Sequence, residues 1–136
     1  MIFDTKIAVV LRDDLPTWQK LNVTAFTVSG IVGISEGTVG ENYEDASGNQ
    51  YLPMIVQPIM IFSANGEEIR KVYGRALSRN VKLAIFTEEL FSTTHDEENR
   101  VAVKKCASED LKLVGMAMRD DKKVIDKVIK GLLLHQ

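Results

Sequence analysis

The chain has 136 residues, 45% of them apolar, so it has the size of one ordinary domain and can bury a hydrophobic core. Its 17 basic and 19 acidic residues give a formal charge of −2, which disfavours binding to nucleic acid or to anionic lipid. Cys106 is the only cysteine, and no apolar run approaches the ~18 residues of a membrane span, so we expect a cytoplasmic protein without disulfides.

The first strand and helix dominate the N-terminal third. Residues 7–11 form an apolar, β-branched run that predicts a strand buried on both faces near the centre of a sheet. Pro16 then suits the first turn of a helix. In that helix, five apolar residues recur at spacings of three and four, and we expect this stripe to pack on the sheet. The stripe consists of Trp18, Leu21, Ala25, Val28 and Val32.

The segment after this helix contains two local patterns. Residues 33–37 match G-x-S-x-G, but they follow a helix, where glycines commonly act as C-caps, so we do not interpret the serine as a nucleophile. Residues 36–52 are polar and predict a long loop. If this loop is a lid, Tyr43 and Asp45 reach a cleft near Lys20. Its acidic residues lack the alternating spacing of a calcium loop, so we assign no metal and no cofactor.

The rest of the chain alternates between strand and helix patterns, which predicts a single α/β domain over residues 1–136. We expect strands at residues 52–62, 81–86 and 111–118, and helices at residues 65–77, at 96–107 and from 120 onward. Pro58 predicts an edge or a bulge in its strand. Asn65 and Glu68 form a capping-box pattern, and Asp96 is the expected N-cap of its helix.

Several polar side chains follow the ends of the first and third predicted strands, which can meet at one edge of the sheet. Lysine, carboxylate, histidine and hydroxyl groups in one cleft suffice for acid–base chemistry or for holding a small anion. They also suffice for helix caps and surface ion pairs. The candidates for catalysis are Lys20, Asp14 and Glu88, and those for ligand binding are Arg12, Thr24, Tyr43, Asp45, His95, Asp96 and Arg100.

Five segments carry a resemblance to a known family: KIAVVLRDDLPTWQKLNVTAF, YEDASGNQY, TTHDEENRVAV, LVGMAMRDDKK and DKVIKGL. They resemble an uncharacterised bacterial family known only as a domain of unknown function, over essentially the whole chain. That family is similar in fold to the type II peptidyl-tRNA hydrolases. Arg12, Asp14 and Leu15 match their R-x-D-L motif. The resemblance implies a four-stranded mixed sheet flanked by helices.

The hydrolase motifs match only in part. Of the G-K-x-A-A-Q pattern in the first helix, only Lys20 is present, and Thr24 stands where the glutamine would be. The D-A-G-x-T pattern after the third strand is replaced by residues 87–91, which read TEELF.

Three functions remain open at this point. The leading one is a pocket for a small polar or anionic ligand. The second is a peptidyl-tRNA hydrolase, in which Lys20 polarises the ester, a carboxylate positions water and tRNA is the partner. The third is a homodimer formed through an edge strand near Pro58 and the apolar tail at residues 132–134.

Overall fold

Strand β1 (Thr5–Arg12) lies at the centre of a mixed five-stranded sheet in the computed structural model, which describes residues 3–136. The strand order is β5-β6-β1-β4-β7. β1 runs parallel to β4 (Ile59–Ala64) and antiparallel to β6 (Leu113–Asp121). Residues 7–11 are buried, which confirms the prediction of a central strand covered on both faces.

The sheet has one strand more than the four predicted. Its edges are β5 (Leu83–Thr87) and β7 (Leu133–Leu134), which pairs with Phe62 and Ser63 of β4. A two-residue strand is too short to show alternation, so the sequence pattern could not distinguish β7 from a tail.

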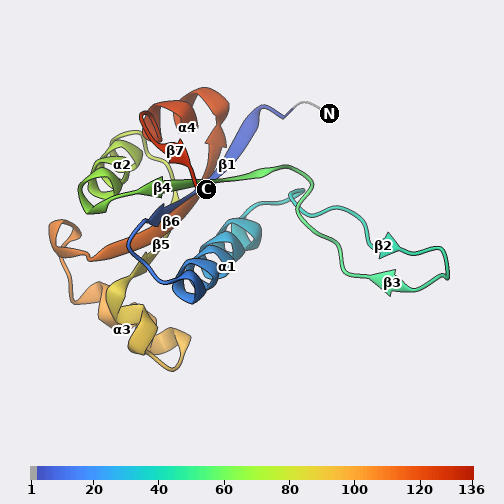
Figure 1. Ribbon diagram of the computed structural model, residues 1–136, viewed down its shortest axis with the longest axis horizontal. Helices are drawn as coiled ribbons and strands as arrows, with labels where there is room; N and C mark the ends of the chain where they lie inside the picture. The colour runs from blue at the N-terminus through green and yellow to red at the C-terminus, as the bar shows by residue number, and fades with distance from the viewer. Residues whose placement is uncertain (1–2) are drawn as a thin grey trace.

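Helices cover both faces of the sheet (Figure 1), as the α/β class predicts. Helix α1 (Thr17–Ile34) packs on one face. Helices α2 (Gly66–Ser78) and α4 (Lys122–Val128) pack on the other. Helix α3 (Asp96–Lys104) lies beside α1 near the β5 edge (Figure 1). None of these helices is long and apolar enough to cross a membrane.

Helix α1 is rotated relative to our prediction, so the predicted apolar stripe is only partly buried, with Val28 packed against the core. Val23, Thr27 and Ile31 face the sheet, whereas Trp18 and Leu21 of the apolar stripe are 60% and 67% exposed. Since Lys20 is the only charged residue of α1, the helix is apolar on both sides and its periodicity does not identify the inner one.

The close packing of α1 on the sheet depends on two glycines, Gly115 and Gly30. A Cβ atom on Gly115 of β6 would lie 2.4 Å from Val23 Cγ1, so only glycine fits under that side chain. A Cβ atom on Gly30 would lie 3.1 Å from the Cβ of Ala84 on β5. These two glycines allow the face of α1 that carries Val23, Thr27 and Ile31 to pack directly on the sheet.

Residues 39–56 form an arm that projects from the body of the protein (Figure 1). Its two short strands, β2 (Tyr43–Glu44) and β3 (Gln50–Tyr51), pair as an antiparallel hairpin, and Val39 pairs with Ile55 at its base. The strand predicted at residues 52–62 instead begins at Ile59, directly after Pro58, because the preceding apolar residues belong to the arm.

Asn65 and Glu68 form the predicted capping box of α2. The C-cap of α1 is Ser35 rather than a glycine, and the last helix begins at Lys122 because Asp120 and Asp121 still belong to β6. At α3 the N-cap is His95 rather than Asp96, because the imidazole accepts a hydrogen bond from the backbone N–H of Glu98. Two 3₁₀ turns, at Glu88–Ser92 (η1) and Ser108–Asp110 (η2), complete the chain.

Candidate functional site

Arg12 joins the carboxyl ends of β1 and β5. Its Nε atom donates to Asp14 Oδ1 at 2.6 Å, and Nη1 donates to Glu88 Oε1 at 2.8 Å. Partial burial lowers the pKa of Arg12, but the hydrogen bonds to Asp14 and Glu88 outweigh it and raise the pKa above its ordinary value. The three predicted site residues thus form one group, in which two carboxylates neutralise the guanidinium.

Lys20, the third predicted catalytic residue, lies apart from this group. Its Nζ atom is 3.1 Å from Nε2 of His135, beside the β4–β7 edge, and its carbonyl accepts from the Thr24 hydroxyl at 2.8 Å. Positions 20 and 24 lie on the side of α1 opposite Asn22 and Phe26, which face α3. The structure therefore does not bring Lys20 and Thr24 together with Glu88 or with the residues of α3.

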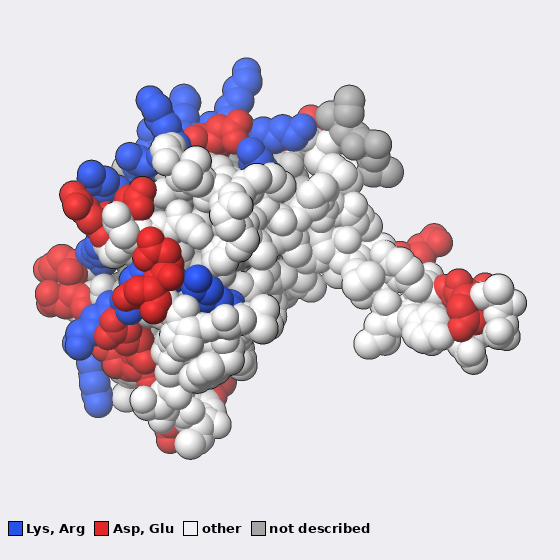
Figure 2. Space-filling view, in the orientation of Figure 1, with Lys and Arg blue, Asp and Glu red and all other residues white. Residues whose placement is uncertain are grey.

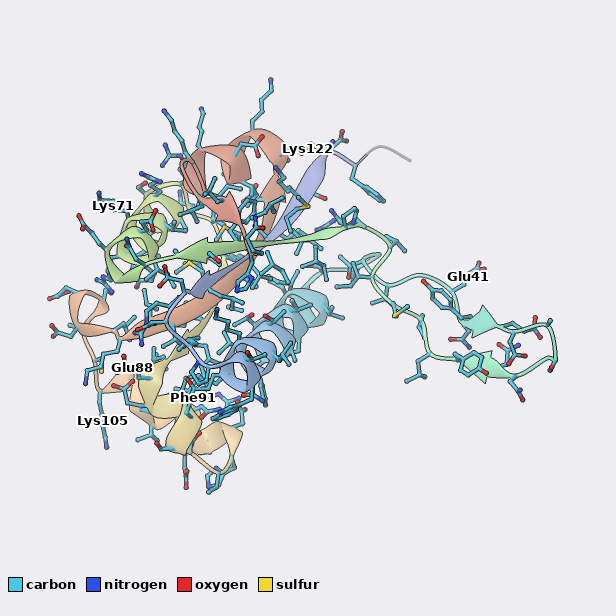
Figure 3. All side chains as sticks on the ribbon, viewed as in Figure 1. Glu41, Lys71, Glu88, Phe91, Lys105 and Lys122 are labelled. Atoms are coloured by element: carbon cyan, nitrogen blue, oxygen red, sulfur yellow. The ribbon has the colours of Figure 1, made fainter. Side chains whose placement is uncertain are left out.

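The concave feature bordered by the predicted residues His95, Asp96 and Arg100 is a groove between α1 and α3, which we call the α1–α3 groove. It consists of two adjoining clefts with volumes of about 460 and 270 Å³, within the range of small-molecule sites. Both clefts share Phe26, Phe86, Leu90, Asp96 and Asn99. Figure 3 shows Phe91 of η1 between α1 and α3, at the wall of this groove.

One wall of the groove is aromatic. The ring of Trp18 meets that of Phe91 edge-on, with centroids 5.8 Å apart. Phe91 lies 4.9 Å from Phe86, which in turn lies 6.1 Å from Phe26. Four rings from α1, β5 and η1 thus form a continuous surface, and the separations are those at which aromatic rings attract one another.

The opposite part of the groove offers hydrogen-bonding groups. The Thr93 hydroxyl hydrogen-bonds to the side-chain oxygen of Asn99, which leaves the Asn99 amide nitrogen without a protein partner among residues 3–136. The Asn22 side chain makes no hydrogen bond to those residues either. Two amides at one end of an aromatic wall can bind the polar part of a ligand whose flat part lies on the rings.

Most charged residues in the first half of α3 form ion pairs with near neighbours in the chain. Arg100 contacts Asp96 and lies 3.2 Å from Glu97, so its charge is balanced within the helix. His95 Nε2 lies 3.4 Å from Glu98, and a backbone hydrogen bond from Thr94 lowers the pKa of Glu98. The predicted residues His95, Asp96 and Arg100 therefore border the groove, but they add little net positive charge to it.

Tyr43 and Asp45 lie on the arm, away from the groove. Figure 3 shows the neighbouring Glu41 on the arm, well away from η1 and α3. Asp45 instead organises the tip of the hairpin: it accepts hydrogen bonds from the backbone of Ser47 and Asn49 and, at 2.6 Å, from the Tyr51 hydroxyl. The arm is therefore an ordered hairpin and does not cover Lys20 in this structure.

Sequence reasoning did not identify Phe26, Phe86, Phe91 and Asn99 as site residues. Phe26 lies outside the regular stripe of α1, which is a weak sign that it faces something other than the sheet. Phe86 and Phe91 belong to different elements, and only the turn at η1 brings their rings together. Within residues 3–136, no group of three or more acidic, histidine or cysteine side chains could hold a metal.

Comparison with known proteins identifies relatives but no activity. A family model described as "Protein of unknown function (DUF2000)" matches residues 5–136. The chain is also similar to a solved structure of the protein of unknown function Atu0240 from Agrobacterium tumefaciens strain C58. The two share 47% sequence identity and a TM-score of 0.97, over 99% of this chain and 100% of that one. No curated protein matches the chain.

Proposed function

Since the chain belongs to the DUF2000 family, whose description gives no activity, we propose a function from geometry: the α1–α3 groove binds a small polar ligand with a planar apolar group. The observation that carries this proposal is the aromatic wall formed by Trp18, Phe26, Phe86 and Phe91, ending at the amides of Asn22 and Asn99.

Burial of exposed aromatic surface favours such a ligand. Trp18 and Phe26 are each more than half exposed, so a flat molecule lying on them removes apolar surface from water on both sides of the contact. The Asn22 and Asn99 amides can both donate and accept, which suits carboxamides, ureas and heterocyclic amides. The binding site therefore combines an apolar anchor with a polar group that fixes orientation.

The charges around the groove favour a neutral ligand over an anionic one. Arg100 is paired with Asp96 and Glu97, and the first turn of α3 already carries three carboxylates. Those carboxylates occupy the positive end of the helix dipole, which would otherwise attract an anion. Lys104, at the far end of the groove, is the only cation lining it without an ion pair among residues 3–136.

No observation favours peptidyl-tRNA hydrolysis. Lys20 contacts His135 rather than Glu88 or Asp14, so the three groups that the reaction would need lie in two places. Positive charge does not gather around the groove to bind tRNA phosphates. The hydrolase remains a prediction from the sequence alone.

Three matched probes test the proposed function: benzamide, benzoate and cyclohexanecarboxamide. Trp18 is the only tryptophan and lies at the groove, so its fluorescence and indole N–H resonance report binding directly. We expect benzamide to shift the Trp18 signal at millimolar concentration, benzoate to bind more weakly, and cyclohexanecarboxamide to bind more weakly still because it lacks a flat ring.

Two variants show whether the signal comes from the groove. Phe26→Ala removes part of the aromatic wall and should weaken benzamide binding, while Leu77→Ala on α2 should leave it unchanged. Benzamide binding that is equal in wild type and Phe26→Ala would contradict the proposed site. Tighter binding of benzoate than of benzamide would contradict the preference for a neutral ligand.

A further inference from the structure

The arm and the outer face of α1 leave a large apolar surface uncovered in the isolated chain. Leu52 and Met54 on the arm are 85% and 60% exposed, and Leu21 and Ile34 of α1 are each 67% exposed. In Figure 2 the region between the body and the base of the arm is free of charged side chains, whereas charged side chains gather elsewhere on the body and Asp and Glu lie on the outer part of the arm. Isolated exposed apolar residues are ordinary, but a continuous patch marks an interaction site.

We propose that this surface joins two copies of the chain, and that the arm of each copy lies along α1 of the other. Both halves of the contact belong to the same chain, so a twofold rotation satisfies both at once. The arm and α1 also match in length. Helix α1, with 18 residues, is about 27 Å long, and the arm extends about 30 Å from its base to its tip.

The exposed area is sufficient for a stable dimer. Eight large apolar side chains of α1 and the arm that do not line the α1–α3 groove are 38% to 85% exposed, and together they offer roughly 900 Å². A stable interface requires about 800 Å² from each partner. These eight are Leu21, Ile34, Val39, Tyr43, Tyr51, Leu52, Met54 and Val56.

The chemistry of the surface selects a second copy over a charged partner. Residues 50–56 of the arm carry no charge, and Lys20 is the only charged residue of α1. Interfaces between identical subunits are the most apolar class, whereas nucleic acid or an acidic peptide would require exposed cations. A groove of about 520 Å³ between the base of the arm and the end of α1, lined by Val32, Val39 and Met54, provides space for apolar side chains of the partner.

Hydrogen bonds to Asp45 stabilise the hairpin of the arm. A hairpin with two residue pairs is marginal in water by itself. Here Asp45 receives hydrogen bonds from Ser47, Asn49 and Tyr51, and Gly48 adopts the positive φ of 87° that the turn requires. A preorganised arm loses less entropy when it contacts a partner, so more of the apolar contact appears as affinity.

Sedimentation of the wild-type chain and three variants tests the proposal. We expect a dimer at micromolar concentration for the wild type and for Leu77→Glu, a control that places the same charge on exposed α2. The arm variant Met54→Glu and the α1 variant Leu21→Glu should each weaken the dimer by at least about 100-fold, because each buries an unpaired charge. All three variants change exposed residues, so unchanged circular dichroism should show that they fold.

A photo-crosslink identifies what the arm touches. Leu52→p-benzoyl-Phe, at an 85% exposed position of the arm, should crosslink to residues 17–34 of the other chain, which is recognised by mixing isotopically labelled and unlabelled protein. A wild type that remains monomeric at micromolar concentration overturns the proposal. So does a dimer that survives both Met54→Glu and Leu21→Glu, or a crosslink confined to one chain. Met54→Glu should still bind benzamide, so failure of the dimer and failure of the groove are separate results.

Discussion

The orientation of α1 predicts that Val23, which lies outside the apolar stripe, contributes more to the free energy of unfolding than Leu21, which belongs to the stripe. Val23 is fully buried above Gly115, whereas Leu21, part of the regular apolar stripe, is 67% exposed. Val23→Ala removes two buried methyl groups, which costs about 1.6 kcal/mol in transfer free energy. The cavity of roughly 50 Å³ that remains adds about 1 kcal/mol. We therefore expect Val23→Ala to lower the free energy of unfolding by about 2–3 kcal/mol.

Leu21→Ala should change the free energy of unfolding by less than about 0.5 kcal/mol, because its side chain contacts mainly water in the single chain. Both substitutions are best measured by urea denaturation in the Met54→Glu background, where a dimer cannot add to the stability of either. Thermal denaturation should show the same order, with Val23→Ala lowering Tm by roughly 5–10 °C. A Leu21→Ala variant that is destabilised as much as Val23→Ala would refute the orientation of the helix.

Three further predictions concern the glycines, the arm and the strand ends. In the urea denaturation assay, Gly115→Ala should destabilise the protein by about 1–3 kcal/mol, because the new methyl group would lie 2.4 Å from Val23 Cγ1. Gly74→Ala, in open space within α2, should instead stabilise it by up to about 1 kcal/mol. Hydrogen bonds from Tyr51 and Asn49 lower the pKa of Asp45 from 3.8 to about 2, so the tip of the arm should keep its structure above pH 4 and lose it as the pH falls through 2. Amide resonances of Ser47 and Asn49 should follow that transition, and Asp45→Ala should remove it while Glu41→Ala should not. Arg12→Ala leaves Asp14 and Glu88 without their cation, so it should lower Tm more than the control Lys71→Ala, whose pair with Glu67 is exposed on α2. Equal effects on Tm would contradict a structural role for the Arg12 group.

Local signals in the sequence were sufficient for most of the fold. The β-branched run at residues 7–11 identified the central strand, and the capping box at Asn65 and Glu68 fixed the start of α2. These features depend on residues that are close in sequence, so their chemistry can be read directly. The order of elements then predicted an α/β domain.

Features that depend on distant residues could not be read in this way. The inner face of α1 is determined by Gly115, more than 80 residues away, because only glycine admits Val23 so closely. The arm appeared as a loop because its strands have two residues each and its order comes from the side chain of Asp45. The aromatic wall likewise forms only when β5 and η1 are placed beside α1.

The candidate site was predicted in part. Arg12, Asp14 and Glu88 meet at the strand ends, as expected from strands that leave the sheet at one edge. His95, Asp96 and Arg100 border the α1–α3 groove, while Lys20 and Thr24 lie on the other side of α1. Lys20 and Asn22 are two residues apart and so point to opposite sides of α1, about 200° around the helix axis. Which of them faces α3 depends on the rotation of α1, and the apolar pattern of the helix does not determine that rotation.

Hydrogen exchange in the presence of a metabolite extract tests most directly whether the α1–α3 groove is the binding site. Extract fractions are added to the wild-type chain, and amide exchange is followed along residues 3–136. The account predicts that at least one fraction slows exchange in residues 88–104, which form η1 and α3, and that Phe26→Ala removes this protection. It also predicts that exchange in residues 40–50 of the arm is unaffected by the same fraction. Protection of residues 40–50 without protection of residues 88–104, or unchanged exchange with every fraction, would contradict the account.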